Sequence, residues 1–524
     1  MKKQKDTINL IGAGLSNLIC AAHLSNQGVK VNIFEAHQEC GGVIGVFKRK
    51  DYIFEKTTHQ MAGFQVKHYI RDILKKIGVK DLEYIKMPYI YETFLINNDE
   101  ILDQYLLLPG IKNFTKILIE NFPQYKEQII KFIKNIVKIT NDTIRIMRVE
   151  DLSSNFFKII PILYDALTAL CLKNKNEKSM VFKIGKFSYK YLVKYYNSTY
   201  SELLKSFDKK IQNLLSQYCF ICDIPPEKMP AILMAVILYV FCFDAPYLVK
   251  NGSKVLIDKL TDIIKSNGGE IFLNKKILKI ILDNKGKAIG LITDKGEKYY
   301  CNKIISGISP QKLFFEMVDN KYVDKEYIKH LKNLELTQSG FMTYIGIPIK
   351  FEDYGIKSSS ILFDFVKKDF FSDPDLKKDN LLLTNFSKFD NYYAPEGKSS
   401  ISIFKFDDYS KWENLSNDQY NKQKKETEKN IIEIVEKFTN VPIENKADII
   451  FSATPLTIKH YMGNYHGEVY ASRRTVEQNF EKRTPTKTPI ENLYLAGAYN
   501  SPGAGIIAVI ENGYMTAKKI LEGL

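Results

Sequence analysis

The stretch INLIGAGLSNLICAAHL, residues 8–24, decides how the first part of the chain folds. An apolar strand leads into a turn with Gly12 and Gly14, and apolar residues at helical spacing begin at Leu15. In the dinucleotide-binding pattern G-x-G-x-x-G, the first glycine permits the tight turn, the second lets the backbone approach a pyrophosphate, and the third allows close helix packing. Asn17 occupies the third position. We expect it to alter packing, by about 1 kcal/mol, and to leave the phosphate-binding turn intact.

The residues after this turn complete a strand–helix–strand unit. QGVKVNIFEA, residues 27–36, supplies the second strand, which ends on Glu35, an acid about 20 residues after the glycines. The N–H groups of Leu15 and Ser16 and the positive end of the helix dipole can bind an anion, and the Ser16 hydroxyl can donate a further hydrogen bond. Glu35 can accept hydrogen bonds from ribose hydroxyls. The pattern predicts a Rossmann-like nucleotide-binding unit of the α/β class.

The next segment carries a resemblance to a known group of enzymes. Gly41 and Gly42 follow soon after Glu35, and FEKTTH, residues 54–59, stands where these enzymes have F-D-x-G-x-H. With these features the sequence resembles the flavin oxidoreductases that include bacterial phytoene desaturases, plant carotenoid isomerase and retinol saturase. The resemblance implies that FAD is the cofactor and that the glycine pair brings backbone N–H groups to its diphosphate.

Three later segments extend the resemblance. VKNGS, residues 249–253, is similar to the P-x-G-G-S motif of the family, with Asn251 in place of a glycine. FSATPLTIKHYMGNYHGEVYA, residues 451–471, is similar to a segment of the carotenoid isomerase and retinol saturase branch. Residues 489–524 resemble the C-terminal signature, whose helix N-terminus faces the flavin. Pattern and resemblance together predict these cofactor-binding residues: Gly12, Gly14, Leu15, Ser16, Glu35, Ala36, Gly41, Gly42, Ile277, Gly497, Ala498, Gly505, Ile506 and Ile507.

The patterns between these segments divide the chain. Apolar residues at helical spacing indicate that residues 111–244 are mostly helical, and alternation predicts strands after a helix at 254–266. Ile277 falls where the resembled family places a backbone amide against the adenine. We expect a discontinuous Rossmann-like FAD-binding domain together with a mixed-sheet substrate domain that carries a helical cap. The FAD-binding parts are residues 1–90, 245–320 and 485–524, and the substrate and cap parts are residues 91–244 and 321–484.

The composition is that of a folded protein with an unusual charge. The 524 residues carry a net charge of +15 from lysines spread along the chain. This charge favours an anionic surface as partner, or it reflects a lysine-rich surface without function. The sequence has no zinc-finger spacing and no nucleic-acid motif, so we expect neither a nucleic-acid partner nor a metal site. Seven cysteines without regular spacing indicate a reducing, cytoplasmic compartment.

Two segments bear on membrane contact. MPAILMAVILYVFCF, residues 229–243, is shorter than the roughly 20 residues that a spanning helix needs, so we expect a buried helix. In KSMVFKIGKFSYKYLVKYY, residues 178–196, Ile184, Phe187 and Tyr191 share one helical face. This helix either lies in a membrane interface, as a peripheral anchor, or packs its apolar face on the protein. The lysines at helical spacing on its other face are Lys183, Lys186, Lys190 and Lys194.

The resemblance implies an FAD-dependent oxidoreductase that acts on a hydrophobic, unsaturated small molecule, such as a polyene or isoprenoid, by desaturation, saturation or isomerisation. His59 and Tyr461 are the candidate catalytic residues from motif position, and a structural hydrogen bond is the alternative role for His59. The sequence has no second glycine fingerprint for a nicotinamide, so the electron acceptor or donor stays unknown. Two other functions stay open: a flavin amine oxidase, and a flavin-free lipid carrier like the GDP-dissociation inhibitors.

Overall fold

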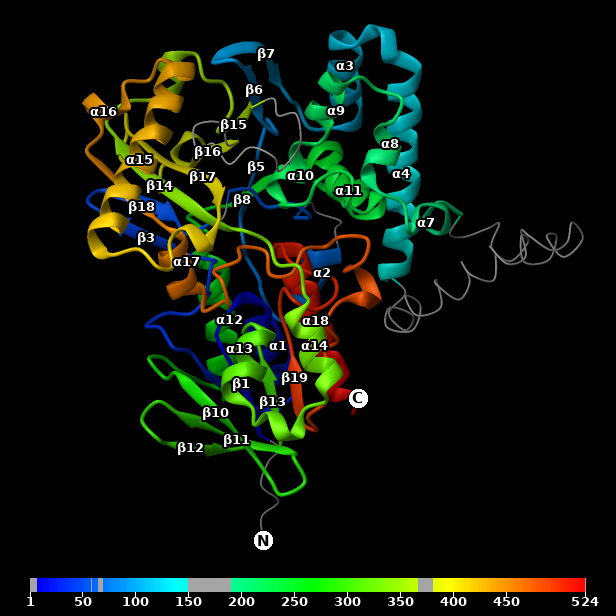
Figure 1. The fold of residues 1–524 in the computed structure, drawn as a ribbon, viewed down its shortest axis with the longest axis vertical. Coiled ribbons are helices and arrows are strands. Elements are labelled where there is room, and N and C mark those ends of the chain that lie inside the picture. The colour runs from blue at the N-terminus through cyan, green and yellow to red at the C-terminus, as the bar shows by residue number, and fades with distance from the viewer. Residues whose placement is uncertain (1–6, 58, 65–68, 149–189, 366–379, 524) are drawn as a thin grey trace, which may run out of the picture. The chain divides into compact units, whose positions relative to one another are not determined.

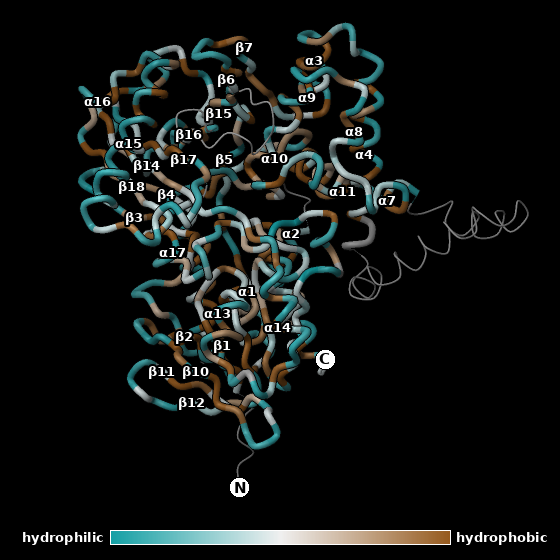
Figure 2. The backbone as a smooth tube through the Cα atoms, viewed as in Figure 1, coloured by the Kyte–Doolittle hydropathy of each residue, from teal (hydrophilic) through white to brown (hydrophobic). Residues whose placement is uncertain are grey.

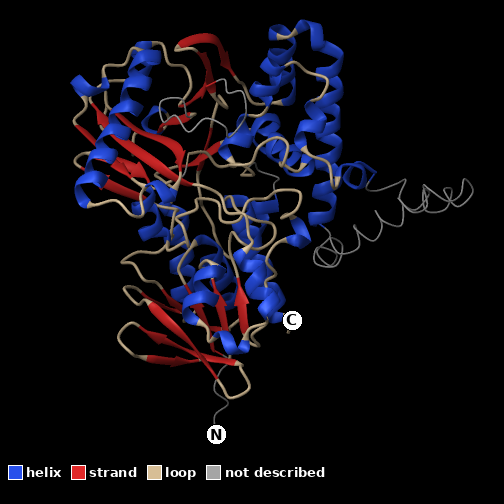
Figure 3. Cartoon of the chain, in the orientation of Figure 1, coloured by secondary structure: helices blue, strands red, loops and turns tan. Residues whose placement is uncertain are grey.

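The computed structural model describes residues 7–57, 59–64, 69–148, 190–365 and 380–523. The chain folds into two compact units. Figure 1 labels the elements of both, and Figure 3 shows that helices make up most of the described part of the second unit. The first unit is formed by residues 1–106, 247–473 and 483–524, and the second by residues 107–246 and 474–482.

A five-stranded parallel sheet forms the nucleotide-binding part of the first unit. Its strand order is β19-β13-β1-β2-β9, with β1 in the middle. Because distant parts of the sequence supply neighbouring strands, the predicted discontinuous Rossmann-like domain and its α/β class are confirmed. The strands are β1 (Thr7–Ile11), β2 (Lys30–Phe34), β9 (Glu270–Phe272), β13 (Lys303–Ser306) and β19 (Leu493–Leu495).

Helices and a small antiparallel sheet pack around these strands. Helix α1 packs against both α12 and α18. The sheet β10-β11-β12 buries Ile280 and Leu291, and Figure 2 shows hydrophobic residues along β10 and β11. The elements are α1 (Leu15–Asn26), α2 (Tyr69–Lys76), α12 (Lys254–Ser266), α13 (Pro310–Lys312), α14 (Lys325–Lys332), α18 (Ile506–Leu521), β10 (Ile277–Leu282), β11 (Ala288–Thr293) and β12 (Lys298–Tyr300).

A seven-stranded mixed sheet forms the other part of the first unit, in the order β18-β14-β17-β16-β15-β6-β7. All pairings are antiparallel except β15 with β6. One face packs on α15 through a core that includes Phe341, Phe363 and Trp412. The elements are β6 (Glu92–Asn97), β7 (Glu100–Leu106), β14 (Ser339–Ile347), β15 (Ser360–Phe365), β16 (Leu381–Asn385), β17 (Ser399–Asp407), β18 (Ile449–Ala453), α15 (Asn417–Thr439), α16 (Ile443–Lys446) and α17 (Pro455–Met462).

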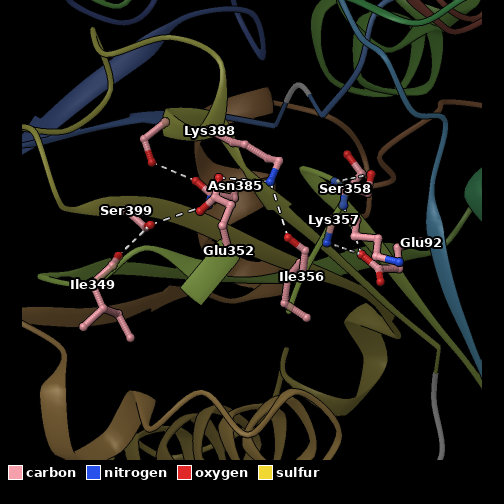
Figure 4. Close-up of polar contacts among 11 residues, drawn as sticks. Glu92, Ile349, Glu352, Ile356, Lys357, Ser358, Asn385, Lys388 and Ser399 are labelled. Atoms are coloured by element: carbon pink, nitrogen blue, oxygen red, sulfur yellow. Dashed lines mark hydrogen bonds and ion pairs between the residues drawn. The ribbon is translucent and has the colours of Figure 1, made fainter. Parts of the chain in front are cut away.

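The loop between β14 and β15 is fixed to this sheet by polar contacts (Figure 4). The buried carboxylate of Glu92 accepts hydrogen bonds from the backbone N–H groups of Lys357 (2.8 Å) and Ser358 (3.0 Å). Lys388 forms an ion pair with Glu352 (3.0 Å) at the other side of the loop. Two short two-stranded sheets complete this unit. The hairpin β3 (Val46–Arg49) and β4 (Tyr52–Glu55) forms one of them, and β5 (Tyr84–Lys86) pairs with the distant strand β8 (Tyr247–Val249) in the other.

The second unit is helical in its described part, as the sequence predicts. It begins at Leu107 because residues 92–106 form the β6–β7 hairpin of the large sheet. The apolar run at 229–243 is a helix that starts after Pro230 and continues into a π-helical segment, Tyr239–Asp244. The helices are α3 (Ile111–Asn121), α4 (Lys126–Arg148), α7 (Lys190–Tyr195), α8 (Tyr200–Leu204), α9 (Lys209–Leu215), α10 (Gln217–Ile221) and α11 (Ala231–Leu238).

Most of the helix predicted to lie in a membrane interface falls outside the described residues, including Lys183 and Lys186. Within α7, Lys190 and Lys194 are exposed and Leu192 is buried. The backbone N–H at residue 191 donates to Asp142 of α4 (2.9 Å). Among the helices that the structure describes, none combines the length and the apolar character needed to cross a membrane.

Candidate active site

The first glycine turn connects β1 to α1 and leaves the N-terminus of the helix uncapped. Gly12 has a φ of +87°, which favours glycine, and its N–H donates to the carbonyl of Phe34 (2.8 Å). Gly14 is the N-cap residue of α1, no side chain caps this end, and a Cβ here would meet nothing within 4 Å. The first N–H groups, at Leu15 and Ser16, therefore belong to a helix end that suits a phosphate.

Asn17 strengthens this turn as well as filling space. Its side chain is buried, and its amide donates to the carbonyls of Ile11 (2.9 Å) and Gly12 (2.8 Å). A Cβ added to Gly307 would come within 2.6 Å of the Asn17 amide nitrogen, so a glycine at 307 leaves the room that Asn17 needs. Two hydrogen bonds therefore offset the packing cost expected from the sequence, and Gly307 provides space for the larger side chain.

Glu35 lies directly beside the turn. Its carboxylate is buried and accepts from the N–H groups of Ala13 (2.7 Å) and His37 (2.9 Å). Ala36, between Glu35 and His37, is exposed. Each carboxylate oxygen accepts one of these hydrogen bonds and has two lone pairs, so each keeps acceptor capacity for a ribose hydroxyl.

The segment that leads to Ile277 is hydrogen-bonded to the backbone around Glu35, at the end of β2. The N–H of Lys275 donates to the carbonyl of Glu35 (2.8 Å), and the N–H of Asn274 donates to the carbonyl of His37 (3.0 Å). Ile277, two residues further on, is buried and begins β10. The segment predicted to contact the adenine is therefore attached to the segment predicted to bind the ribose.

The glycine pair at 41 and 42 packs against the first turn. The N–H of Gly41 donates to the carbonyl of Ala13 (2.8 Å), and Gly41 has a φ of +113°. A Cβ on Gly41 would lie 2.3 Å from the carbonyl oxygen of Ile44, and one on Gly42 would lie 3.6 Å from the Cα of Gly14. The two predicted diphosphate-binding turns therefore meet with no side chain between them.

The C-terminal signature joins this site through Asn512, which sequence reasoning missed. Its side-chain oxygen accepts from the Ser16 hydroxyl (3.0 Å) and from the N–H of Gly497 (2.6 Å). Its amide donates to the carbonyl of Ser501 (2.9 Å). A Cβ on Gly513 would lie 2.2 Å from the carbonyl oxygen of Ser16, so α1 and α18 approach closely at this glycine. An asparagine within an apolar helix is the one sequence signal that could have identified this link.

The start of α18, like that of α1, has no side-chain cap. Gly505 is its N-cap residue with a φ of +104°, and no side chain caps the N–H groups that follow at Ile506 and Ile507. This end of the helix suits the edge of the flavin that gains negative charge on reduction. Before it, the carbonyl of Ala498 accepts from Arg483 (2.6 Å), a buried residue that the sequence did not single out.

His59 lies against the seven-stranded sheet. Its Nδ1 is 2.9 Å from the hydroxyl of Thr384, and its ring lies 5.9 Å from the ring of Phe404. Burial lowers the pKa of His59 to about 4, so the imidazole is neutral at pH 7. With Nδ1 bound to Thr384, Nε2 is the ring atom that stays available to a reacting group.

A polar row on the sheet positions the segment that contains His59. Tyr344 donates to the carbonyl of Lys56 (2.5 Å), and the Gln60 amide donates to Ser360 (2.9 Å). The strand register places the side chains of this row side by side, so the segment crosses the strands over it. The row consists of Tyr344, Ser402, Thr384 and Ser360.

An apolar row adjoins the polar one on the same face of the sheet. Its members lie two residues along each strand, where side chains return to the same side. All are buried, and one of them contacts the ring of His59. The row consists of Met342, Phe404, Leu382 and Leu362.

Tyr461 lies elsewhere, near the end of α17. Thr454 caps the start of this helix by accepting from the N–H of Thr457 (3.4 Å), and Gly463 ends it with a φ of +64°. The Tyr461 side chain is 63% exposed, and its ring lies 5.6 Å from the ring of His37. The structure does not bring Tyr461 and His59 into contact, and these contacts of Tyr461 give no support to a role in the chemistry.

Glu55, in the FEKTTH segment, holds the start of α12. Its carboxylate accepts from the N–H of Ser253 (2.8 Å), from the Ser253 hydroxyl (2.5 Å) and from the hydroxyl of Tyr393 (2.7 Å). Burial raises the pKa of Glu55 to about 7 despite these hydrogen bonds. The acid of this segment therefore has a structural partner in the 249–253 motif.

The fold and these turns define an FAD-binding protein of the Rossmann-like class, since open glycine turns, an acid at a strand end and two uncapped helix ends fit the parts of this dinucleotide. Residues 15–521 match the family of flavin-containing amine oxidoreductases. The chain belongs to this family. It is an FAD-dependent oxidoreductase, and the enzyme interpretation is confirmed over the flavin-free carrier.

Three curated relatives are similar to this chain over most of its length and most of their own. Chloroplastic prolycopene isomerase from Daucus carota is 24% identical over 98% of this chain and 80% of its own. A 4,4'-diapophytoene desaturase from Staphylococcus aureus (strain COL) is 23% identical over 99% of both chains. All-trans-retinol 13,14-reductase from Danio rerio is 23% identical over 93% of this chain and 81% of its own. The predicted resemblance is confirmed by these relatives.

Solved structures share the fold at lower identity. Putrescine oxidase bound to putrescine has a TM-score of 0.64 at 11% identity, and the match covers 99% of both chains. RAB GDI from Plasmodium falciparum has a TM-score of 0.51 at 13% identity, again over 99% of both chains. These two likenesses concern the fold alone. Within the described residues, histidine, cysteine and carboxylate side chains form no group that could hold a metal ion.

Proposed function

We propose that this FAD-dependent oxidoreductase acts on a hydrophobic, unsaturated substrate, a polyene, isoprenoid or similar chain, by desaturation, saturation or flavin-assisted isomerisation. By name, the relatives act on prolycopene, 4,4'-diapophytoene and all-trans-retinol, which are chemically alike, through an isomerase, a desaturase and a reductase. The shared substrate class supports the proposal, and the three different reactions leave the direction open.

One structural observation carries the proposal further: a neutral histidine stands beside an apolar row. His59 has a pKa of about 4 and touches Phe404. A charged imidazole next to a hydrocarbon would lose the hydration of its charge without gaining an ionic partner. A neutral imidazole has no charge to desolvate, so its burial costs less free energy. Phe404 and the row to which it belongs offer dispersion contacts and no charge. The surroundings of His59 therefore suit an apolar group better than an ammonium group.

The chemistry divides between cofactor and chain. When bound, FAD supplies the two-electron exchange of a hydride at the flavin N5 position. The chain supplies the binding surface and a group for the neighbouring proton, and the free Nε2 of His59 can accept or release that proton. Thr384 fixes the ring through Nδ1. Desaturation then requires an external electron acceptor and saturation an external donor, both unassigned, while isomerisation needs no net exchange.

The test uses the purified holoenzyme without oxygen. An acyclic polyene, all-trans-retinol and putrescine are added in turn, and the flavin absorbance and the products are recorded. We expect the polyene or the retinoid to change the flavin bands or to be converted. His59→Ala should lower that conversion by about 10²- to 10⁴-fold if the side chain handles the proton. Reduction of the flavin by putrescine alone would contradict the proposal and support an amine oxidase.

An apolar substrate dissolved in a bilayer also requires membrane contact, which we propose through residues 178–196. Sedimentation with anionic vesicles at low and high salt tests this, because each lysine near the surface should add about 1 kcal/mol of attraction. Changing Lys186, Lys190 and Lys194 to glutamate should weaken sedimentation. Equal sedimentation of variant and wild type would remove this segment from the proposal.

A further inference from the structure

Three aromatic side chains beside Glu35 have no part in the site described so far. They are His37, which follows β2, and His460 and Tyr461, at the end of α17. The ring centroids lie 5.7 Å apart between His37 and His460, 5.6 Å between His37 and Tyr461, and 5.0 Å between His460 and Tyr461. Two segments more than 400 residues apart therefore build one ring cluster.

The backbone attaches this cluster to the predicted ribose site. The N–H of His37 donates to the carboxylate of Glu35 (2.9 Å), and the carbonyl of His37 accepts from the N–H of Asn274 (3.0 Å). The cluster thus adjoins both the ribose acid and the segment that leads to Ile277. Since one bond joins a ribose to its base, the adenine of a nucleotide held by Glu35 lies within reach of both.

The exposure of the cluster also indicates a ligand. Tyr461 is 63% exposed and His460 is exposed as well, although their rings touch one another. Ala36, between Glu35 and His37, is exposed and carries only a methyl group. Covering large exposed rings with a flat apolar surface is favourable, because it removes apolar area from water. A purine base provides such a surface, and stacking on it needs no charged partner.

We propose that His37, His460 and Tyr461 form a stacking platform for the adenine of FAD. Tyr461 is then a cofactor-binding residue, and the motif at 451–471 carries it to the adenosine end of the site. Thr454 caps the start of α17 and Gly463 its end, and these caps fix the position of Tyr461 on the helix. The inference concerns the cofactor and does not depend on the identity of the substrate.

The test measures cofactor affinity and not turnover. FAD is removed from the holoenzyme, and the protein is titrated with FAD, with ADP and with FMN, which lacks the adenosine. Tyr461→Ala should weaken FAD and ADP binding by about 5- to 100-fold, the range for loss of base stacking on an aromatic side chain. Binding of FMN should be unchanged. Tyr461→Phe keeps the ring and should bind all three as the wild type does.

A matched control is Tyr300→Ala, because Tyr300 is 62% exposed on β12. It should leave all three affinities unchanged. If Tyr461→Ala binds FAD within twofold of the wild type, the proposal is overturned and the rings serve only to hold α17. An equal loss of FAD and FMN affinity would overturn it too, since the effect would then not involve adenine. Loss of FAD affinity in Tyr461→Phe would assign the effect to the hydroxyl, against stacking.

Discussion

Two turn–helix segments in this protein carry an asparagine where the related motifs have glycine, and a buried glutamate accepts a hydrogen bond from each turn. In the first turn, the N–H of Ala13 donates to Glu35 (2.7 Å) ahead of α1. In the second, the N–H of Ser253 donates to Glu55 (2.8 Å) ahead of α12. The likeness makes the differences between them informative.

The two asparagines replace glycine for different reasons. Asn17 lies in α1 and acts through its side chain, which donates to two carbonyls of the turn. Asn251 has a φ of +63°, in the left-handed region that asparagine tolerates better than most residues, and its backbone N–H donates to Asp390 (2.7 Å). At position 17 asparagine therefore replaces a glycine that provides space, and at position 251 it replaces a glycine that provides backbone freedom.

The two glutamates differ in what remains free. Within the described part of the chain, Glu35 accepts only from the backbone N–H groups of Ala13 and His37. Glu55 also accepts from the hydroxyls of Ser253 and Tyr393, and its pKa is raised to about 7. The first turn thus keeps a carboxylate for a ligand, whereas the second uses its carboxyl group within the protein.

Replacing Glu55 should give the largest effect. Its pKa lies above the ordinary value of 4.5, so between pH 4.5 and 7 the folded protein binds more protons than the unfolded chain. The free energy of unfolding therefore falls as pH rises through this window, by an amount on the order of 3 kcal/mol. Glu55→Gln should remove this contribution and leave the similar one of Glu511, whose pKa burial also raises to about 7, as denaturant titrations at pH 5 and pH 8 can show. Identical pH dependence in both proteins would contradict the assignment.

Glu35→Ala tests the carboxylate of the first turn. Loss of a charge-assisted hydrogen bond to ribose should weaken FAD binding by about 1.5–3 kcal/mol. Titration of the FAD-free protein measures it, with Glu270→Ala on β9 as a control that should change nothing. Unaltered affinity in Glu35→Ala would show that the ribose does not bind there.

Gly307→Ala tests the space used by Asn17. The added Cβ would lie 2.6 Å from the Asn17 amide nitrogen, and overpacking of this kind lowers stability by about 1–3 kcal/mol. In combination with Asn17→Gly the loss should largely disappear, because the clashing side chain is gone. A double-mutant cycle on the free energy of unfolding measures the coupling, and additive effects would disprove it.

Asn17→Gly alone should affect stability more than binding. It removes two hydrogen bonds and places a glycine in a helix, which together lower stability by about 1–3 kcal/mol. The phosphate-binding N–H groups stay in place, so FAD affinity should change by no more than a few-fold. A large gain in affinity would mean that asparagine impairs the site, and a large loss would reveal a direct contact with the cofactor.

Asn251→Gly should have the smallest effect, within about 0.5 kcal/mol, since glycine adopts the same φ without strain. Asn251→Ala should lower stability by about 1 kcal/mol, because alanine is strained in the left-handed region. Thermal unfolding of the three proteins compares them. If Ala and Gly variants match, backbone freedom is not what this position provides.

Elements whose ends are marked by residues nearby in the sequence were the easiest to predict. The helix at 254–266 has the expected bounds, because its apolar residues recur at helical spacing and Gly268 and Gly269 follow shortly after it. Asn512, Gly307 and Arg483 escaped prediction, since each acts on a segment that only the fold brings near. Tyr461 was assigned to the chemistry from its motif, yet its neighbours are His37 and His460.

The hydrogen bond between Ser16 and Asn512 joins residues 496 positions apart. A ribosome adds about 5–20 residues per second, so the first glycine turn exists for roughly 25–100 s before its partner is made. During that time β1 has β2 to pair with, but neither β13 nor β19 at first. Nascent chains therefore depend on late-made residues to retain cofactor, and a chain cut short before α18 should leave the ribosome colourless and be removed by proteases.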